Sequence, residues 1–137
     1  MLEIGADVDT KEENENTPLH FACQLGCLDI VKPLLSWKAK INAKNAHGST
    51  PLHLACLNGY IEVVKQLSHV KADIEAKDNN GFTPLHLASE NGSLVCVKHL
   101  LELGADWTVK NASQKTPLQL ASHNGHLEVQ GILKSQN

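Results

Sequence analysis

The sequence contains no arginine, since all twelve of its basic residues are lysines, and its formal net charge is −3. Recognition of phosphate groups and of guanine relies heavily on the forked arginine side chain, and nucleic-acid-binding domains usually have a basic excess. The composition therefore argues against nucleic-acid binding, and it excludes recognition of phosphopeptides by an arginine cluster.

Aromatic residues are also scarce, at 4% of the 137 residues. Apolar residues still make up 42%, which is enough for a core of Leu, Ile, Val and Ala packed in a regular, repetitive way. No stretch approaches the roughly 18 apolar residues of a membrane helix, and no secretion signal is recognisable at the N-terminus. We therefore expect no membrane insertion and a location in the cytoplasm or the nucleus.

One four-residue string recurs at a fixed interval. Thr-Pro-Leu-His begins at Thr17, Thr50 and Thr83, the variant Thr-Pro-Leu-Gln begins at Thr116, and each start follows the last by 33 residues. With this threonine as position 0, all four copies have alanine at position 5, glycine at position 9 and leucine at position 17. A period held over four copies indicates a repeat architecture.

Each copy predicts a pair of helices. Threonine is a good N-cap, and proline suits the first helical position because the N–H that it lacks would be unpaired there. Apolar residues at positions 2, 5 and 6 form one helical face, and the glycine at position 9 fits a left-handed residue that ends the helix. A second apolar face follows at positions 11, 14, 17 and 18, as in Leu94, Val97, Leu100 and Leu101. Such short helices are marginal alone, so we expect stability to come from stacking.

These residues resemble the ankyrin repeat. The 33-residue period, the Thr-Pro-Leu-His start, the glycine after the first helix and Gly-Ala-Asp after the second all match, over essentially the whole chain. The resemblance implies an all-α fold, an ankyrin-repeat α-solenoid of stacked helix-turn-helix units with projecting β-hairpin-like loops. We expect one domain over residues 1–137, with a stub of an earlier repeat at 1–9, repeats at 10–42, 43–75 and 76–108, and a C-terminal capping repeat at 109–137.

Four departures from the pattern make the first two copies the softer half. Pro33 lies inside a predicted helix, where it removes a hydrogen bond, and Ser68 replaces a leucine at position 18. Lys38 and Lys71 replace the glycine after the second helix, and a left-handed conformation there costs a non-glycine residue about 1–2 kcal/mol.

The histidines and cysteines favour scaffold roles over chemistry. His20, His53 and His86 share position 3, which favours a repeated hydrogen bond in the first helical turn. Cys23 and Cys56 share position 6 and are expected to be small buried hydrophobes. The spacing of Cys23 and Cys27 does not match a Cys-x-x-Cys pair. We therefore expect no enzyme, no metal and no cofactor.

A partner is expected at positions that the scaffold leaves free. The resemblance places these at the loop tips and on the inner face of the first helix, which together form a concave groove. The aromatic residues Phe82 and Trp37 are hot-spot candidates, with covering of apolar surface as the alternative, whereas Trp107 is expected to pack. The candidate binding residues are Glu13, Asn14, Asn16, Gln24, Leu25, Trp37, Ala46, His47, Ser49, Leu57, Asn58, Asn79, Asn80, Phe82, Glu90, Asn91, Ala112, Ser113, Lys115, His123 and Asn124.

Charge varies along the chain. Glu12, Glu13 and Glu15 make the first loop acidic, and lysines make the next one basic. Such runs are usually solvated surface, but a graded pattern could also orient a partner. The resemblance also matches Asn42 to an asparagine that intracellular hydroxylases modify in some ankyrin repeats, although Lys40 departs from the acidic residue often found upstream.

Two functions stay open from the sequence. The first is a monomeric protein-interaction module that binds a protein or peptide partner in the groove. The alternative is a structural or regulatory repeat segment of a larger multidomain protein, such as a channel, a ubiquitin-ligase receptor or an enzyme. A shared fold does not identify the partner.

Overall fold

The computed structural model describes residues 7–136, and the stub predicted at residues 1–9 therefore lies mostly outside the described residues. The elements are η1 (Glu13–Glu15), α1 (Pro18–Leu25), α2 (Leu28–Ser36), α3 (Pro51–Leu57), α4 (Ile61–His69), α5 (Pro84–Asn91), α6 (Leu94–Glu102), α7 (Pro117–His123) and α8 (Leu127–Lys134). The pairs α1–α2, α3–α4, α5–α6 and α7–α8 follow one another along the chain.

The first helix of every pair begins as the sequence predicts. Thr17, Thr50, Thr83 and Thr116 are the N-caps, with proline as the first helical residue. Each threonine forms a reciprocal capping box with the residue at position 3, which is histidine in three pairs and Gln119 in the last. Two backbone N–H groups that a helix N-terminus would leave unpaired are satisfied in this way.

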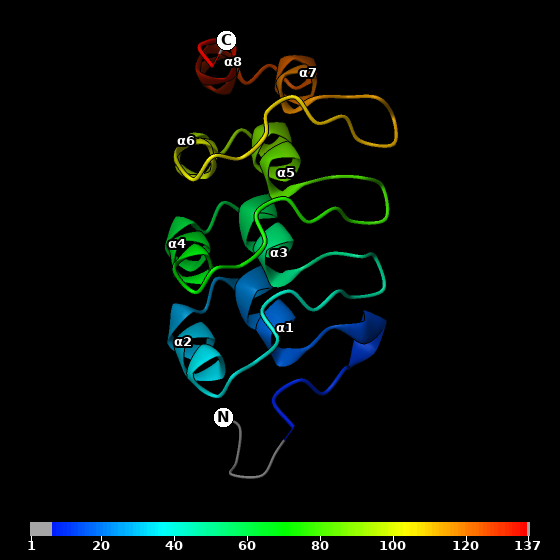
Figure 1. Cartoon of the computed structure of the whole chain (residues 1–137), viewed down its shortest axis with the longest axis vertical. Coiled ribbons are helices and arrows are strands. Elements are labelled where there is room, and N and C mark those ends of the chain that lie inside the picture. The colour runs from blue at the N-terminus through cyan, green and yellow to red at the C-terminus, as the bar shows by residue number, and fades with distance from the viewer. Residues whose placement is uncertain (1–6, 137) are drawn as a thin grey trace.

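The helices stack in two columns, as Figure 1 shows. Helices α1, α3, α5 and α7 pack side by side in an inner column, and α2, α4, α6 and α8 form the outer column. The loops that connect one pair to the next project away from the inner column on one side of the stack (Figure 1). This arrangement confirms the predicted all-α solenoid.

One continuous core lies between the columns. The leucines at position 17, which are Leu34, Leu67, Leu100 and Leu133, are each at most 2% exposed. Trp107 is partly buried and packs against this core, as predicted. Position 13 is also buried where it holds Val63, Cys96 or Val129.

Left-handed backbone recurs at fixed positions. The glycine at position 9 has a φ between +71° and +75° in all four repeats. Position 21 has a φ of +62° at Lys38, +67° at Lys71 and +89° at Gly104, so the two lysines adopt the conformation that glycine tolerates best. The strain predicted at these lysines is therefore present.

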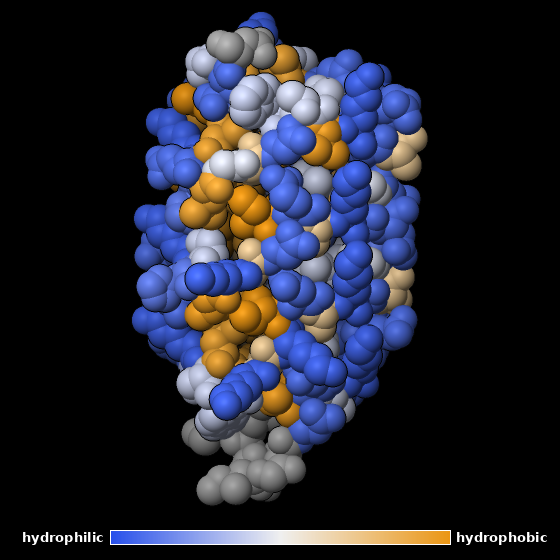
Figure 2. Space-filling view, viewed as in Figure 1, coloured by the Kyte–Doolittle hydropathy of each residue, from blue (hydrophilic) through white to orange (hydrophobic). Residues whose placement is uncertain are grey.

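The outer surface is apolar in places. Figure 2 shows a band of hydrophobic side chains along the stack, over the junction of the two columns and between hydrophilic margins. The residues that end α2, α4 and α6 are all apolar, with Trp37 45% exposed, Val70 half-buried and Leu103 43% exposed, and we name them the end row. Within residues 7–136, no helix has the length and apolar content needed to cross a bilayer.

Candidate partner-binding groove

A single side chain closes each of the last three projecting loops. Asn45 Oδ1 accepts hydrogen bonds from the backbone N–H groups of His47 and Ser49, both at 3.0 Å. Asp78 and Asn111 do the same in the next two loops. The first loop has Glu12 at this position, where the longer side chain makes no such pair of bonds, and the chain forms the 3-10 turn η1 instead. Asx turns of this kind explain why the loops hold a defined shape.

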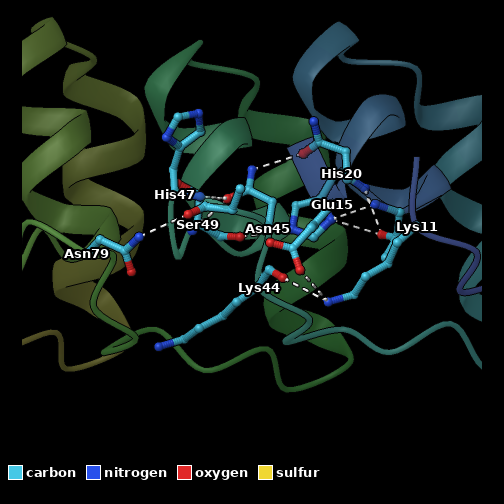
Figure 3. A network of polar contacts seen from close by, with 11 residues as sticks. Lys11, Glu15, His20, Lys44, Asn45, His47, Ser49 and Asn79 are labelled. Carbon is cyan, nitrogen blue, oxygen red and sulfur yellow. Dashed lines mark hydrogen bonds and ion pairs between the residues drawn. The ribbon is translucent and has the colours of Figure 1, made fainter. Parts of the chain in front are cut away.

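Backbone hydrogen bonds join the loops to one another. The N–H of Ala46 donates to the carbonyl of Asn14 at 2.8 Å, that of Asn79 to His47 at 3.0 Å, and that of Ala112 to Asn80 at 2.9 Å. Figure 3 shows the polar contacts between the first loops, including the bond that Asn79 Nδ2 donates to the carbonyl of Ala46 in the preceding loop. The loops therefore form one connected wall rather than four independent tips.

The histidines at position 3 join each repeat to the next. The N–H of Thr17 donates to His20 Nδ1 at 3.0 Å, so Nδ1 lacks a proton and the proton lies on Nε2. His20 Nε2 then donates to the carbonyl of Ser49, 2.8 Å away in the following loop. His53 and His86 make the same bonds, to Phe82 and Lys115. The predicted first-turn role is confirmed, and it includes a second bond to the next repeat.

These imidazoles are held neutral. His20, His53 and His86 are 0% exposed, and burial lowers the pKa of each below its ordinary value, although the bond to the backbone carbonyl offsets part of this shift. Protonation would place a second hydrogen on Nδ1, facing the threonine N–H that donates to it. Acid therefore opposes the bond between each imidazole and its own helix N-cap, whereas the Nε2 bond to the next loop does not depend on a neutral ring.

The exposed faces of the inner helices, which are the expected floor of the groove, change along the stack. At position 8, Leu25 is 68% exposed, and the following repeats have exposed asparagines there. At position 4, Phe21 is 36% exposed, Leu54 is half-buried, and the last two leucines are 9% exposed. Phe21 and Leu54 were missed by the sequence reasoning. The aromatic side chain of Phe21, where the other repeats have leucine, was the available signal.

Asparagines in the candidate set prove to be partly structural. Asn58 Nδ2 donates to the carbonyl of Gln24 at 3.3 Å, and Asn124 Nδ2 donates to that of Glu90 at 3.0 Å. The prediction that Asn16 is a binding residue is wrong, because Asn16 is only 8% exposed and its Oδ1 accepts a hydrogen bond from Asn45 Nδ2 at 2.9 Å. Its position at the base of the first loop places it inside the scaffold and not on the binding surface.

The two aromatic candidates also need revision. Trp37 ends α2 in the outer column, so its exposed side chain belongs to the end row and not to the groove. Phe82 is half-buried, and its ring lies 5.7 Å from the ring of His86, centroid to centroid. Its backbone N–H and carbonyl are both hydrogen-bonded. Phe82 therefore covers the buried histidine at least as much as it faces solvent.

The other candidates line the wall and the floor. Ser49, Leu57 and Glu90 are half-buried. The exposed members are Glu13, Asn14, Gln24, Leu25, Ala46, His47, Asn79, Asn80, Asn91, Ala112, Ser113, Lys115 and His123, together with Asn58 and Asn124.

The thiols belong to the core and not to the groove. Cys23, Cys56 and Cys96 are free and buried. Burial raises the pKa of Cys23 to about 12 and raises those of Cys56 and Cys96 as well, so these thiols stay protonated at neutral pH. Within residues 7–136, no three His, Cys, Asp or Glu side chains are grouped as a metal site would require.

Comparison with known proteins agrees with this architecture. A family model described as "Ankyrin repeats (3 copies)" matches residues 1–78, and another, "Ankyrin repeats (many copies)", matches residues 67–121. The chain is also similar to "Protein fem-1 homolog A" of Danio rerio, with 51% identity over 35 residues. That match covers 26% of this chain and 6% of the Danio rerio protein.

Proposed function

This chain belongs to the ankyrin-repeat family, whose members are generally protein–protein interaction modules and typically non-catalytic, and we propose that it binds a protein or peptide partner in the groove between its loop wall and its inner helices. The single observation that carries the proposal is the exposure of Leu25. A leucine that is 68% exposed on the floor of a braced groove is costly to leave in water and gains by being covered.

The scaffold around this leucine supports the proposal. The loops are joined by backbone bonds and tied to the inner helices by the histidines, so the groove is preorganised. A preorganised surface loses less conformational entropy when a partner binds.

A pull-down from native extract with quantitative mass spectrometry tests the proposal. The wild-type chain is compared with Leu25→Asp/Leu57→Asp, which places charge on the floor. The matched control is Val95→Asp/Leu127→Asp. Val95 is 54% exposed on α6 and Leu127 is 77% exposed on α8, so both lie on the outer helices. We expect bound proteins to be lost with the floor variant and kept with the control. Equal retention by both folded variants would exclude the groove.

The end row favours a second function, packing against another part of a larger protein. Trp37 and Leu103 are 45% and 43% exposed at the ends of outer helices, away from the groove. A photo-crosslinking residue in place of Leu25 or of Leu103 separates the two functions in cells. Crosslinks from residue 25 to a separate protein support the groove, whereas crosslinks from residue 103 alone support packing through the end row.

A further inference from the structure

The first repeat has an apolar residue on the floor of the groove where the other repeats have polar ones. This difference comes from the residue type and not from extra exposure at the end of the stack. Position 8 is exposed in every repeat, in Leu25, Asn58, Asn91 and Asn124 alike. The exposure of Leu25 therefore follows from its place in the groove. What differs is the side chain, because only the first repeat has an apolar residue there.

The next inner helix also has apolar side chains that are not fully buried. Helices α1 and α3 pack side by side, and the bond from Asn58 Nδ2 to the carbonyl of Gln24, 3.3 Å long, holds their C-terminal ends together. Leu57 directly precedes Asn58 and is half-buried. Phe21 and Leu54 lie one turn back on the same two helices. We call these four side chains, Phe21, Leu25, Leu54 and Leu57, the apolar floor.

The loop wall beside the apolar floor is acidic. Glu12, Glu13 and Glu15 are all exposed, in and next to η1. The nearest cation in this loop is Lys11, whose Nζ lies 4.0 Å from Glu15 and 3.4 Å from the carbonyl of Lys44. Because that contact is long and solvent-exposed, it neutralises little of the charge of three carboxylates.

The same wall in the last repeat has a different charge. The loop there contains Ser113 and Lys115, and the floor has His123 and Asn124. The groove therefore runs from an end with an apolar floor over the first two repeats and an acidic first loop to a polar, weakly basic end at the last repeat. A partner that matches this gradient binds in one direction.

We propose, on the basis of the proposed function, that the first half of the groove binds a peptide segment that combines apolar side chains with a cluster of lysines or arginines. The apolar side chains cover the apolar floor, and the basic cluster faces Glu12, Glu13 and Glu15. Neighbouring helices lie about 8–10 Å apart, and a polyproline-II chain, with three residues per turn, rises about 9 Å over three residues. A peptide in this conformation therefore reaches both α1 and α3 with apolar side chains three positions apart, which lie on one face of the peptide.

A selection from a library of random displayed peptides tests this chemistry directly. The library is panned on three folded proteins: the wild type, Leu25→Ser/Leu57→Ser, and Glu12→Gln/Glu13→Gln/Glu15→Gln. The matched control is Val95→Ser/Glu128→Gln, which changes one exposed apolar and one exposed acidic residue on the outer helices. Circular dichroism confirms that each variant is folded before it is used.

We expect the peptides enriched on the wild type to be rich in lysine or arginine and in apolar residues. Their affinity should fall at least roughly tenfold on each groove variant and stay unchanged on the control. Raising the salt from about 0.05 M to about 0.5 M should weaken binding to the wild type more than binding to the Glu→Gln variant.

The failures of the two proposals are distinguishable. If the enriched peptides need Leu25 and Leu57 but are acidic or uncharged, the groove is the binding site and the inferred partner chemistry is overturned. If no enriched peptide loses affinity on the Leu25→Ser/Leu57→Ser variant, the groove itself is not the site, and the proposed function is overturned together with the inference.

Discussion

The first and third repeats are built on the same plan but use different residues where the backbone is most demanding. The third repeat has Gly81 in its loop and Gly104 after its second helix, both with positive φ. At the same two places the first repeat has Glu15 and Lys38, which adopt a φ of +60° and +62°. The first repeat also has Pro33 inside α2.

This difference suits a division of tasks, in which the third repeat supplies stability and the first repeat supplies the proposed binding surface. The third repeat follows the local preferences of the chain throughout, whereas the first departs from them in a loop, in a helix and at a helix end. The acidic wall and two members of the apolar floor, Phe21 and Leu25, lie in the first repeat, which departs from these preferences. Residues selected for a surface are free to conflict with local backbone preference when neighbouring repeats supply the stability.

Both repeats depend on a buried, neutral histidine at position 3, and acid opposes that neutral state. We therefore expect acid to have the largest effect on the free energy of unfolding. His20 and His86 have a pKa below the ordinary value of 6.5 in the folded chain, as does His53. Because the unfolded chain then binds more protons, stability is full above about pH 6.5 and falls as the pH drops toward the folded-state pKa. Each histidine can contribute up to about 1.4 kcal/mol per pH unit in that window. Urea unfolding between about pH 7.5 and about pH 4.5 measures the slope.

The fourth repeat supplies the control for this prediction. Gln119 replaces the histidine there, and its Oε1 accepts from the N–H of Thr116 at 2.8 Å, so the capping box is kept without a titrating group. The variant His53→Gln should therefore show a shallower loss of stability with acid. An unchanged pH slope in His20→Gln/His53→Gln/His86→Gln would show that other groups cause the acid sensitivity.

Replacing Pro33 is the next largest change. Proline inside a helix costs about 3 kcal/mol, partly offset by its stiffening of the unfolded chain, which is worth about 0.4–1 kcal/mol. The second repeat has Gln66 at this position, so Pro33→Gln should raise the free energy of unfolding by about 2 kcal/mol. Hydrogen exchange should show the gain in α2. The reverse exchange, Gln66→Pro, should destabilise α4 by a similar amount. If both variants are as stable as the wild type, proline does not destabilise the helix at this position.

Position 21 tests the left-handed strain alone. Relief of about 1–2 kcal/mol of strain, less the 0.5–1 kcal/mol entropic cost of glycine, predicts that Lys38→Gly or Lys71→Gly stabilises by about 0.5–1 kcal/mol. Gly104→Lys should cost about as much, and a Cβ at Gly104 would meet nothing within 4 Å, so steric clash does not interfere. Thermal and urea unfolding should both show a gain in stability for Lys38→Gly and Lys71→Gly and a loss for Gly104→Lys. Destabilisation by Lys38→Gly would mean that the lysine side chain makes contacts that outweigh the strain.

The sequence was sufficient for the scaffold but not for the fine structure of the groove. The threonine N-caps, the left-handed glycines and the strained lysines followed from local rules that depend on a few neighbouring residues. The burial of Asn16 did not, because it depends on a bond to Asn45 in the next loop. The role of Asn58 likewise depends on a carbonyl 34 residues away. Repeat position shows which residues share a surface, but not which of their polar atoms are already used by the neighbouring repeat.

The smallest effect on stability is expected in the acidic loop. The contact between Lys11 and Glu15 is 4.0 Å long and both side chains are at least half exposed, so Glu15→Gln should change the free energy of unfolding by less than about 0.5 kcal/mol. Glu62→Gln, which removes the similar contact with Lys65 on α4 at 3.9 Å, is the matched control and should also be near neutral. Urea unfolding at low salt gives both values. A loss well above that of Glu62→Gln would mean that the acidic loop supports the fold. Near-neutral values for both would leave Glu15 without a structural task, as a surface that binds a basic partner requires.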